Sequence, residues 1–194
     1  MESSDFAKKY LVDLKELINV ININEITEFI KEIENVYKNE KTIFIMGNGG
    51  SAATASHFAC DINKGVSLKL QKKFKVLCLN DNISIMLAYA NDISYDSIFI
   101  EQLKNYISKG DLVIGISGSG NSKNVLNAIE YSNKVGARTF GIIGCDGGKL
   151  KDIAQKSLIV RSFDMQKIED CHMILTHLTM QYFSKKFKKE ISVT

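Results

Sequence analysis

Apolar residues recur at every third or fourth position over the first forty residues, and this spacing predicts two amphipathic helices. We place the first at Phe6–Asn19 and the second at Ile26–Tyr37, after a break at 22–24 in which Asn24 is a suitable helix cap. Neither helix has a strand of its own to cover. Their apolar faces therefore pack either on the rest of the fold or on a partner subunit.

From residue 42 onwards the pattern changes to short apolar runs that alternate with helical segments. The runs lack polar alternation, as is typical of parallel strands covered on both faces. The predicted strands are Thr42–Met46, Lys75–Leu79, Asp111–Ser117, Arg138–Ile143 and Ser157–Val160. The predicted helices are Ala52–Ile62, Ile83–Ala90, Ser97–Ile107, Lys123–Val135, Lys149–Ala154 and Lys167–Lys186. Right-handed crossovers then produce a doubly wound, three-layer α/β sandwich around a five-stranded parallel sheet.

The composition is typical of a globular protein, since 45% of the residues are apolar and 24% are charged. We predict a single domain that spans residues 1–194. The net charge of +3 is too small to indicate nucleic acid as a partner. The first residues are polar and acidic, unlike a signal peptide, and no apolar run is long enough to span a bilayer. With four dispersed cysteines and no CxxC pair, we expect a reduced, cytoplasmic protein without a membrane partner.

Two turns rich in glycine and serine follow the first and third predicted strands, at Met46–Ser51 and Ser117–Ser122. Each turn opens a helix, where backbone N–H groups, serine hydroxyls and the helix dipole all favour an anion. Ligands of such sheets bind beyond the carboxyl ends of the strands. Two such turns in one small chain therefore predict a phosphorylated small molecule held between strand ends.

Other interpretations of these turns remain open. Gly47–Ala52 fits a loose GxGxxA dinucleotide pattern, but the ribose-binding acid could only be Asp81 and the second turn would have no role. No GK[ST] follows the glycines, so the first turn is not a P-loop. Both segments could also be tight turns that bind no ligand. Ser122 could simply cap the next helix and Ser117 could simply end its strand. Ser119, between two glycines, is the best single candidate for a phosphate contact.

All three histidines lie on two predicted helices near carboxylates. His57 and Asp61 are four apart, which places them on one helix face about one turn apart. On the last helix Glu169 and His177 are eight apart and nearly in phase, with His172 at the side of that face. These groups could form an acid–base set, or they could bind a divalent ion such as zinc. Glu169 could also be an exposed acid at a helix start.

Four segments together resemble bacterial phosphoheptose isomerases, which belong to the sugar-isomerase (SIS) fold group. Met46–Gly65 is similar to their active-site segment and Ile116–Val125 to their sugar-phosphate loop, while Gly141–Leu150 and Ile168–Leu178 are similar to later segments. The similarity covers nearly the whole chain. It implies an SIS fold and an isomerase that converts sedoheptulose 7-phosphate to D-glycero-D-manno-heptose 7-phosphate, for lipopolysaccharide or capsule synthesis.

The resemblance also implies roles for individual residues. Asp61 would move a proton between adjacent carbons through an enediol, with His177 as its partner, and no nucleotide or redox cofactor is required. In family members with zinc, the matching ligands would be His57, Asp61, Glu169 and His177, and an ion held by all four would leave Asp61 unavailable as a free base. The residues that would hold the substrate are Asn48, Gly49, Gly50, Ser51, Asp92, Ser117, Gly118, Ser119, Ser122 and Glu169.

Four positions depart from the family pattern. Asp61 stands where Glu is usual, and its carboxylate reaches about one bond length less. Glu169 stands where Gln is usual, Gln166 replaces a common Asp, and Gly118 replaces a usual Thr. The added negative charge near the histidines favours a bound cation, or it indicates a different sugar phosphate.

The resemblance implies a homotetramer in which residues 1–40 and the last helix supply the interface, while residues 41–194 form the sandwich. A second hypothesis is a non-catalytic SIS module that binds sugar phosphates or the replication initiator. Such a module can lose the acid–base pair, so the presence of His57, Asp61 and His177 argues against it. A nucleotide-binding oxidoreductase is a distant third.

Overall fold

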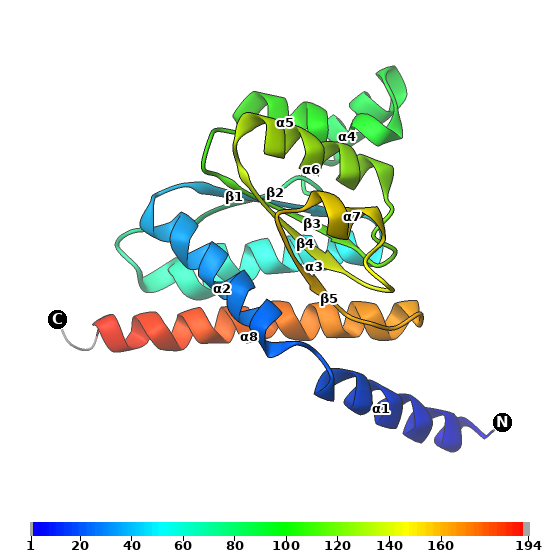
Figure 1. The fold of residues 1–194 in the computed structure, drawn as a ribbon. Coiled ribbons are helices and arrows are strands. Elements are labelled where there is room, and N and C mark those ends of the chain that lie inside the picture. The colour runs from blue at the N-terminus through cyan, green and yellow to red at the C-terminus, as the bar shows by residue number, and fades with distance from the viewer. Residues whose placement is uncertain (1, 192–194) are drawn as a thin grey trace.

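The computed structural model describes residues 2–191, so Met1 and residues 192–194 of the predicted domain lie outside the described residues. One all-parallel sheet has the strand order β2-β1-β3-β4-β5 (Figure 1). Its strands are β1 (Thr42–Gly47), β2 (Lys75–Cys78), β3 (Leu112–Ser117), β4 (Arg138–Ile143) and β5 (Lys156–Ile159). The predicted α/β class and the five-stranded parallel sheet are confirmed.

Helices cover both faces of this sheet and make the three layers visible in Figure 1. Phe29, Phe58 and Phe183 belong to a buried cluster on the first face, and Phe99 and Ile129 to a second cluster on the other. The helices of the first face are α2 (Ile23–Lys38), α3 (Gly50–Cys60) and α8 (Met165–Ile191). Those of the second face are α4 (Ile83–Asp92), α5 (Ile100–Tyr106), α6 (Lys123–Val135) and α7 (Gly148–Ile153).

Helix α1 (Ser3–Asn19) differs from the others because it extends away from the three layers (Figure 1) and buries none of its side chains fully. The Tyr10 hydroxyl donates to the Asp170 carboxylate at 2.5 Å and so ties α1 to α8. Among the described residues, large apolar side chains of α1 stay exposed, including Leu11 at 65% and Val12 at 54%. The chain thus carries an apolar surface that its own fold does not cover.

Two local features depart from the sequence expectation. Helix α2 begins at Ile23 because Asn22, and not Asn24, is its cap, and the Asn22 side chain accepts a bond from the Asn24 N–H at 2.9 Å. Helix α3 continues into a π-helix, η1 (Asp61–Val66), and two short 3₁₀ turns, η2 (Ser67–Lys69) and η3 (Tyr95–Ser97), occur in connections. Apolar spacing does not distinguish a π turn from an α turn over so few residues.

His172 lies fully buried on α8, and neither of its ring nitrogens has a hydrogen-bond partner within residues 2–191. Burial lowers the pKa of His172 to about 4. The backbone of Ile143 opposes that shift, and the effect of burial is the larger of the two. The imidazole is therefore neutral in the folded protein at pH 7 and becomes charged there only under acid conditions.

This burial makes stability depend on pH. The unfolded chain takes up a proton on His172 near pH 6.5, whereas the folded chain does so near pH 4, so the free energy of unfolding falls as pH drops through this window. We expect a loss of about 2 kcal/mol between pH 7 and pH 5. Urea unfolding at pH 7, 6 and 5 should show this loss in the wild type but not in His172→Leu.

Thr176→Val is the matched control, since Thr176 is equally buried one turn further along α8 and does not titrate. It should change stability by the same amount at every pH. An equal pH slope in the wild type and His172→Leu would contradict the assignment.

Candidate active site

The strand order changes direction between β1 and β3, and this switch point places the two glycine- and serine-rich turns side by side. Gly47 at the end of β1 pairs with Ile116 near the end of β3. Turn 1 (residues 47–51) and turn 2 (residues 117–122) therefore leave neighbouring strands at the same edge of the sheet. In open parallel sheets this is where a crevice for ligands forms.

Turn 1 leads directly into α3 and meets an acid from α8. Gly49 has φ +54°, a backbone conformation that favours glycine, and Ser51 is buried in the first helical turn. A β-carbon at Gly50 would overlap the Glu169 carboxylate, so Glu169 lies against the N-terminal end of α3. The helix dipole favours a negative charge at this position.

Turn 2 is organised by its serines. The buried Ser117 Oγ accepts a bond from the Gly120 N–H at 3.1 Å and lies 3.1 Å from the Ser122 Oγ. Ser122 occupies the N-cap position of α6, but its side chain makes no capping bond, so capping does not explain this hydroxyl. Ser119 is exposed at the tip of the turn, and Gly118 is buried beside it.

Turn 2 is also held by the loop before α7, a contact that the sequence did not predict. The Asn121 Oδ1 accepts a bond from the Lys149 N–H at 3.1 Å, and the Gly120 carbonyl accepts one from the Leu150 N–H at 2.9 Å. A β-carbon at Gly120 would overlap the Gly147 carbonyl, so the two loops touch backbone to backbone. The paired glycines at 147 and 148 were the only signal of this contact in the sequence.

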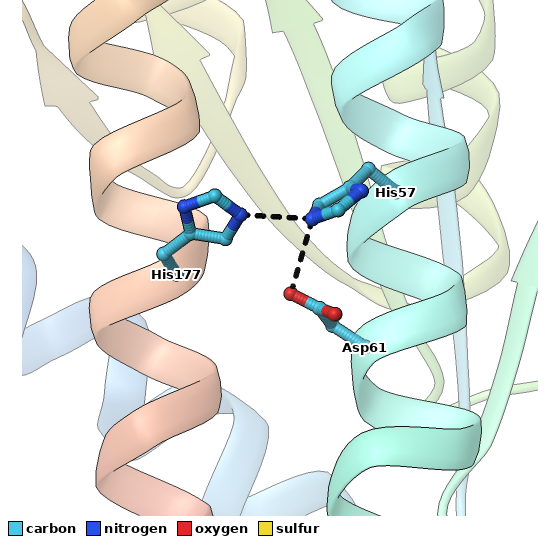
Figure 2. Close-up of side chains that lie close together, drawn as sticks. All are labelled: His57, Asp61 and His177. Carbon is cyan, nitrogen blue, oxygen red and sulfur yellow. Dashed lines mark hydrogen bonds and ion pairs between the residues drawn. The ribbon is translucent and has the colours of Figure 1, made fainter.

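Three of the predicted chemical groups converge at the other end of α3. Figure 2 shows His57 of α3, Asp61 at the first position of η1 and His177 of α8 pointing toward one another. The His57 Nε2 lies 2.8 Å from the His177 Nε2 and 3.4 Å from an Asp61 carboxylate oxygen. Both imidazoles are exposed and Asp61 is half-buried, so the cluster is open to solvent. The shorter Asp61 side chain thus still reaches both the imidazole and the surface.

The donor set of this cluster fits a divalent ion such as zinc. One atom from each of His57, Asp61 and His177 lies within 4.8 Å of the others. A tetrahedral zinc holds two ligand nitrogens about 3.4 Å apart, so the imidazoles would need to separate by only a fraction of an ångström from their 2.8 Å contact. Three protein ligands and one open position are the pattern of catalytic zinc sites.

Two predicted site residues lie apart from this cluster. Glu169 is not in the group of three potential ligands, and its carboxylate lies against Gly50, so the structure brings together three of the four implied ligands. Asp92 is exposed at the end of α4, where its carboxylate accepts a bond from the Asn91 side chain at 2.8 Å. A role for Asp92 at the site remains a prediction.

Asn48 connects turn 1 to α6 and η3, through residues that the sequence did not single out. The Asn48 side chain bonds to that of Asn124 in α6 and accepts a bond from the Tyr95 hydroxyl of η3. Their positions beside predicted turns gave no distinct signal, because an asparagine near a helix start and a tyrosine in a loop are common.

Among the described residues, no helix combines the length and apolarity needed to cross a bilayer.

A five-stranded parallel sheet with helices on both faces and two glycine-rich turns at its switch point defines an α/β protein, and the sequence profile of the SIS domain matches residues 8–144. A probable phosphoheptose isomerase from Thermoplasma acidophilum is 35% identical over 93% of this chain and 99% of its own length. A phosphoheptose isomerase from Helicobacter pylori is 39% identical over 77% of this chain and 78% of its own. The chain belongs to the phosphoheptose isomerase family of SIS-domain proteins.

Solved structures agree with this membership. The phosphoheptose isomerase GmhA from Neisseria gonorrhoeae has a TM-score of 0.84 and 26% identity, covering 94% of this chain and 96% of its own. A phosphoheptose isomerase from Francisella tularensis has a TM-score of 0.87 at 22% identity, covering 95% of this chain and 100% of its own. The second likeness shows the fold alone.

Proposed function

We propose that the protein is a sedoheptulose 7-phosphate isomerase that forms D-glycero-D-manno-heptose 7-phosphate by aldose–ketose isomerisation. The observation that carries this proposal is the convergence of Asp61 and His177, from separate helices, in a member of this family whose two glycine- and serine-rich turns leave neighbouring strands. We further propose that the reaction takes place in the cytoplasm and supplies heptose for lipopolysaccharide or capsule.

Substrate binding in this proposal begins with the phosphate at turn 2. Hydrogen-bond donors come from the hydroxyls of Ser117, Ser119 and Ser122 and from the backbone at Gly118. The N-terminal end of α6 adds a favourable dipole. The sugar chain then extends along turn 1, over Asn48, Gly49, Gly50 and Ser51, toward the histidine cluster. Asp92 and Glu169 contact hydroxyl groups along that path.

The chemistry is a proton transfer between two adjacent carbons. Asp61 removes the proton from the carbon beside the carbonyl, which leaves an enediol, and returns that proton to the neighbouring carbon. His177 moves the second proton between the two oxygens, so that one carbonyl becomes a hydroxyl as the other forms. No atom is lost or gained, and no redox cofactor takes part.

We also propose that His57, Asp61 and His177 hold one zinc ion, with Glu169 as a fourth ligand if its side chain leaves Gly50. A zinc ion there would polarise the substrate carbonyl and stabilise negative charge on the oxygens. Zinc binding and proton transfer compete for these groups, because a nitrogen or oxygen lone pair that binds the ion is not available to accept a proton.

The hypothesis of a non-catalytic SIS module is not favoured. The relatives that align with most of this chain are named as isomerases, and the acid–base groups that such a module can lose stand together here. None of the relatives named above points to a nucleotide cofactor.

Removal of either acid–base group tests the proposed reaction. Asp61→Asn and His177→Ala should each lower kcat for sedoheptulose 7-phosphate by about a hundredfold or more, because each removes a proton-transfer group. Asp152→Asn, at an exposed position of α7, should leave kcat unchanged. A wild-type protein that binds the sugar phosphate without converting it would overturn the proposal and favour the binding module.

A separate measurement tests the zinc site. His57→Ala removes one ligand without removing either proposed proton-transfer group, so calorimetric titration should show zinc affinity reduced by at least about tenfold. Cys60→Ser is the control, because this exposed thiol adjoins Asp61 and could bind zinc adventitiously. Equal zinc affinity in the wild type and His57→Ala would place the ion elsewhere.

We propose that the protein is a homotetramer assembled through residues 1–40 and α8, since the exposed apolar face of α1 suits burial against other copies. Light scattering should then give a mass near four times that of the 21.7 kDa chain. Leu11→Glu should dissociate the assembly, because it places a charge in the apolar contact. Glu16→Lys, at an exposed polar position that faces away from Leu11 on the same helix, should not dissociate it. A monomeric wild type would refute the proposal.

A further inference from the structure

The side chain of Asn48 lies at the centre of a chain of hydrogen bonds that joins three segments of the fold. Asn48 and Asn124 exchange two bonds, because each Nδ2 donates to the other Oδ1 at 2.9 Å. The Tyr95 hydroxyl donates a third bond to the Asn48 Oδ1 at 2.8 Å. Asn124 is fully buried, Asn48 is half-buried and Tyr95 is exposed.

A backbone group fixes the direction of every bond in this chain. The Val125 N–H donates to the Asn124 Oδ1 at 3.0 Å. A backbone N–H can only donate, so the Asn124 atom that faces it must be the oxygen and the other must be the nitrogen. The Asn124 nitrogen then requires the Asn48 oxygen as its acceptor. Tyr95 faces that same oxygen and therefore acts as a donor.

The consequence for Asn48 follows from counting its hydrogen-bonding capacity. An amide oxygen has two lone pairs, and those of Asn48 are taken by Asn124 and Tyr95. The amide nitrogen has two hydrogens, of which one is taken by Asn124. One N–H is left. A cavity of about 250 Å³, lined in part by Asn48, Gly49 and Tyr95, lies next to this group.

We propose that Asn124 and Tyr95 are positioning residues that make Asn48 a pure hydrogen-bond donor toward the sugar phosphate. Asn48 then recognises an oxygen that accepts, such as the carbonyl or an oxyanion, and cannot accept a bond from a hydroxyl. This inference rests on the proposed function, because it concerns how that substrate is held. Asn48 would act merely as a structural tie between turn 1 and α6 if its free N–H met no ligand.

Tyr95→Phe tests the inference at an exposed residue, where folding is not at risk. Loss of the hydroxyl frees one lone pair of the Asn48 oxygen and loosens the amide. We expect KM for sedoheptulose 7-phosphate to rise about three- to tenfold, with less than about a twofold change in kcat, as for one neutral hydrogen bond. Asn124→Asp keeps the acceptor for Val125 but loses the donor to Asn48, and it should raise KM further.

Inorganic phosphate, tested as a competitive inhibitor, separates positioning from general structural damage. It lacks the sugar carbonyl that the Asn48 N–H is proposed to contact, so we expect its inhibition constant to be the same in the wild type and Tyr95→Phe. Tyr106→Phe, which removes an exposed tyrosine hydroxyl at the end of α5, is the matched control and should leave both constants unchanged. Equal weakening of phosphate and of the sugar phosphate would indicate a structural tie and overturn the inference.

The inference and the proposed function fail separately. If the wild type converts sedoheptulose 7-phosphate but KM is unaltered in Tyr95→Phe and Asn124→Asp, the inference is wrong and the function stands. If the wild type converts nothing, the function is wrong. The dissociation constant for sedoheptulose 7-phosphate, measured by calorimetry in the same variants, then replaces KM as the readout for the inference.

Discussion

The pairing of β1 with β3 is the constraint on which the rest of this structure depends. Gly47 lies beside Ile116, so the chain leaves the sheet twice at neighbouring points and starts two helices there. A different strand order would separate the turns, and the bonds between Asn48 and Asn124 could not form. The switch point therefore brings together the two glycine- and serine-rich turns and also defines the place from which α3 carries His57 toward His177.

Helices α3 and α8 act together as a second framework. Glu169 lies against Gly50 at the start of α3, while His177 meets His57 further along. The separations of seven residues on α3 and eight on α8 are nearly equal, so the two helices run in the same direction and stay in register over two turns. One helix pair thus fixes both the acid at turn 1 and the contact between the two imidazoles.

Local patterns were sufficient to predict the sheet, most of the helices and the placement of His57 and Asp61 on one helix face, because strand and helix periods and an i,i+4 spacing are local properties, whereas the roles of Asp61 and His177 came from the family resemblance. They were not sufficient for contacts between distant segments. Tyr95 and Asn124 gain their roles only when turn 1, η3 and α6 meet, and the placement of Glu169 against Gly50 depends on how α8 packs. The π turn at Asp61 and the cap at Asn22 depend on backbone choices that apolar spacing leaves open.

The position of Glu169 makes the two helix starts unequal. Helix α3 already has a carboxylate of the protein itself at its positive end, whereas α6 begins at Lys123 with no acid in its first turn. A group with two negative charges that approaches this edge is thus repelled from the start of α3 and attracted to the start of α6. For the proposed substrate, whose phosphate is its single anionic group, this difference favours one orientation of binding, with the phosphate at the start of α6 and the uncharged end toward the histidines.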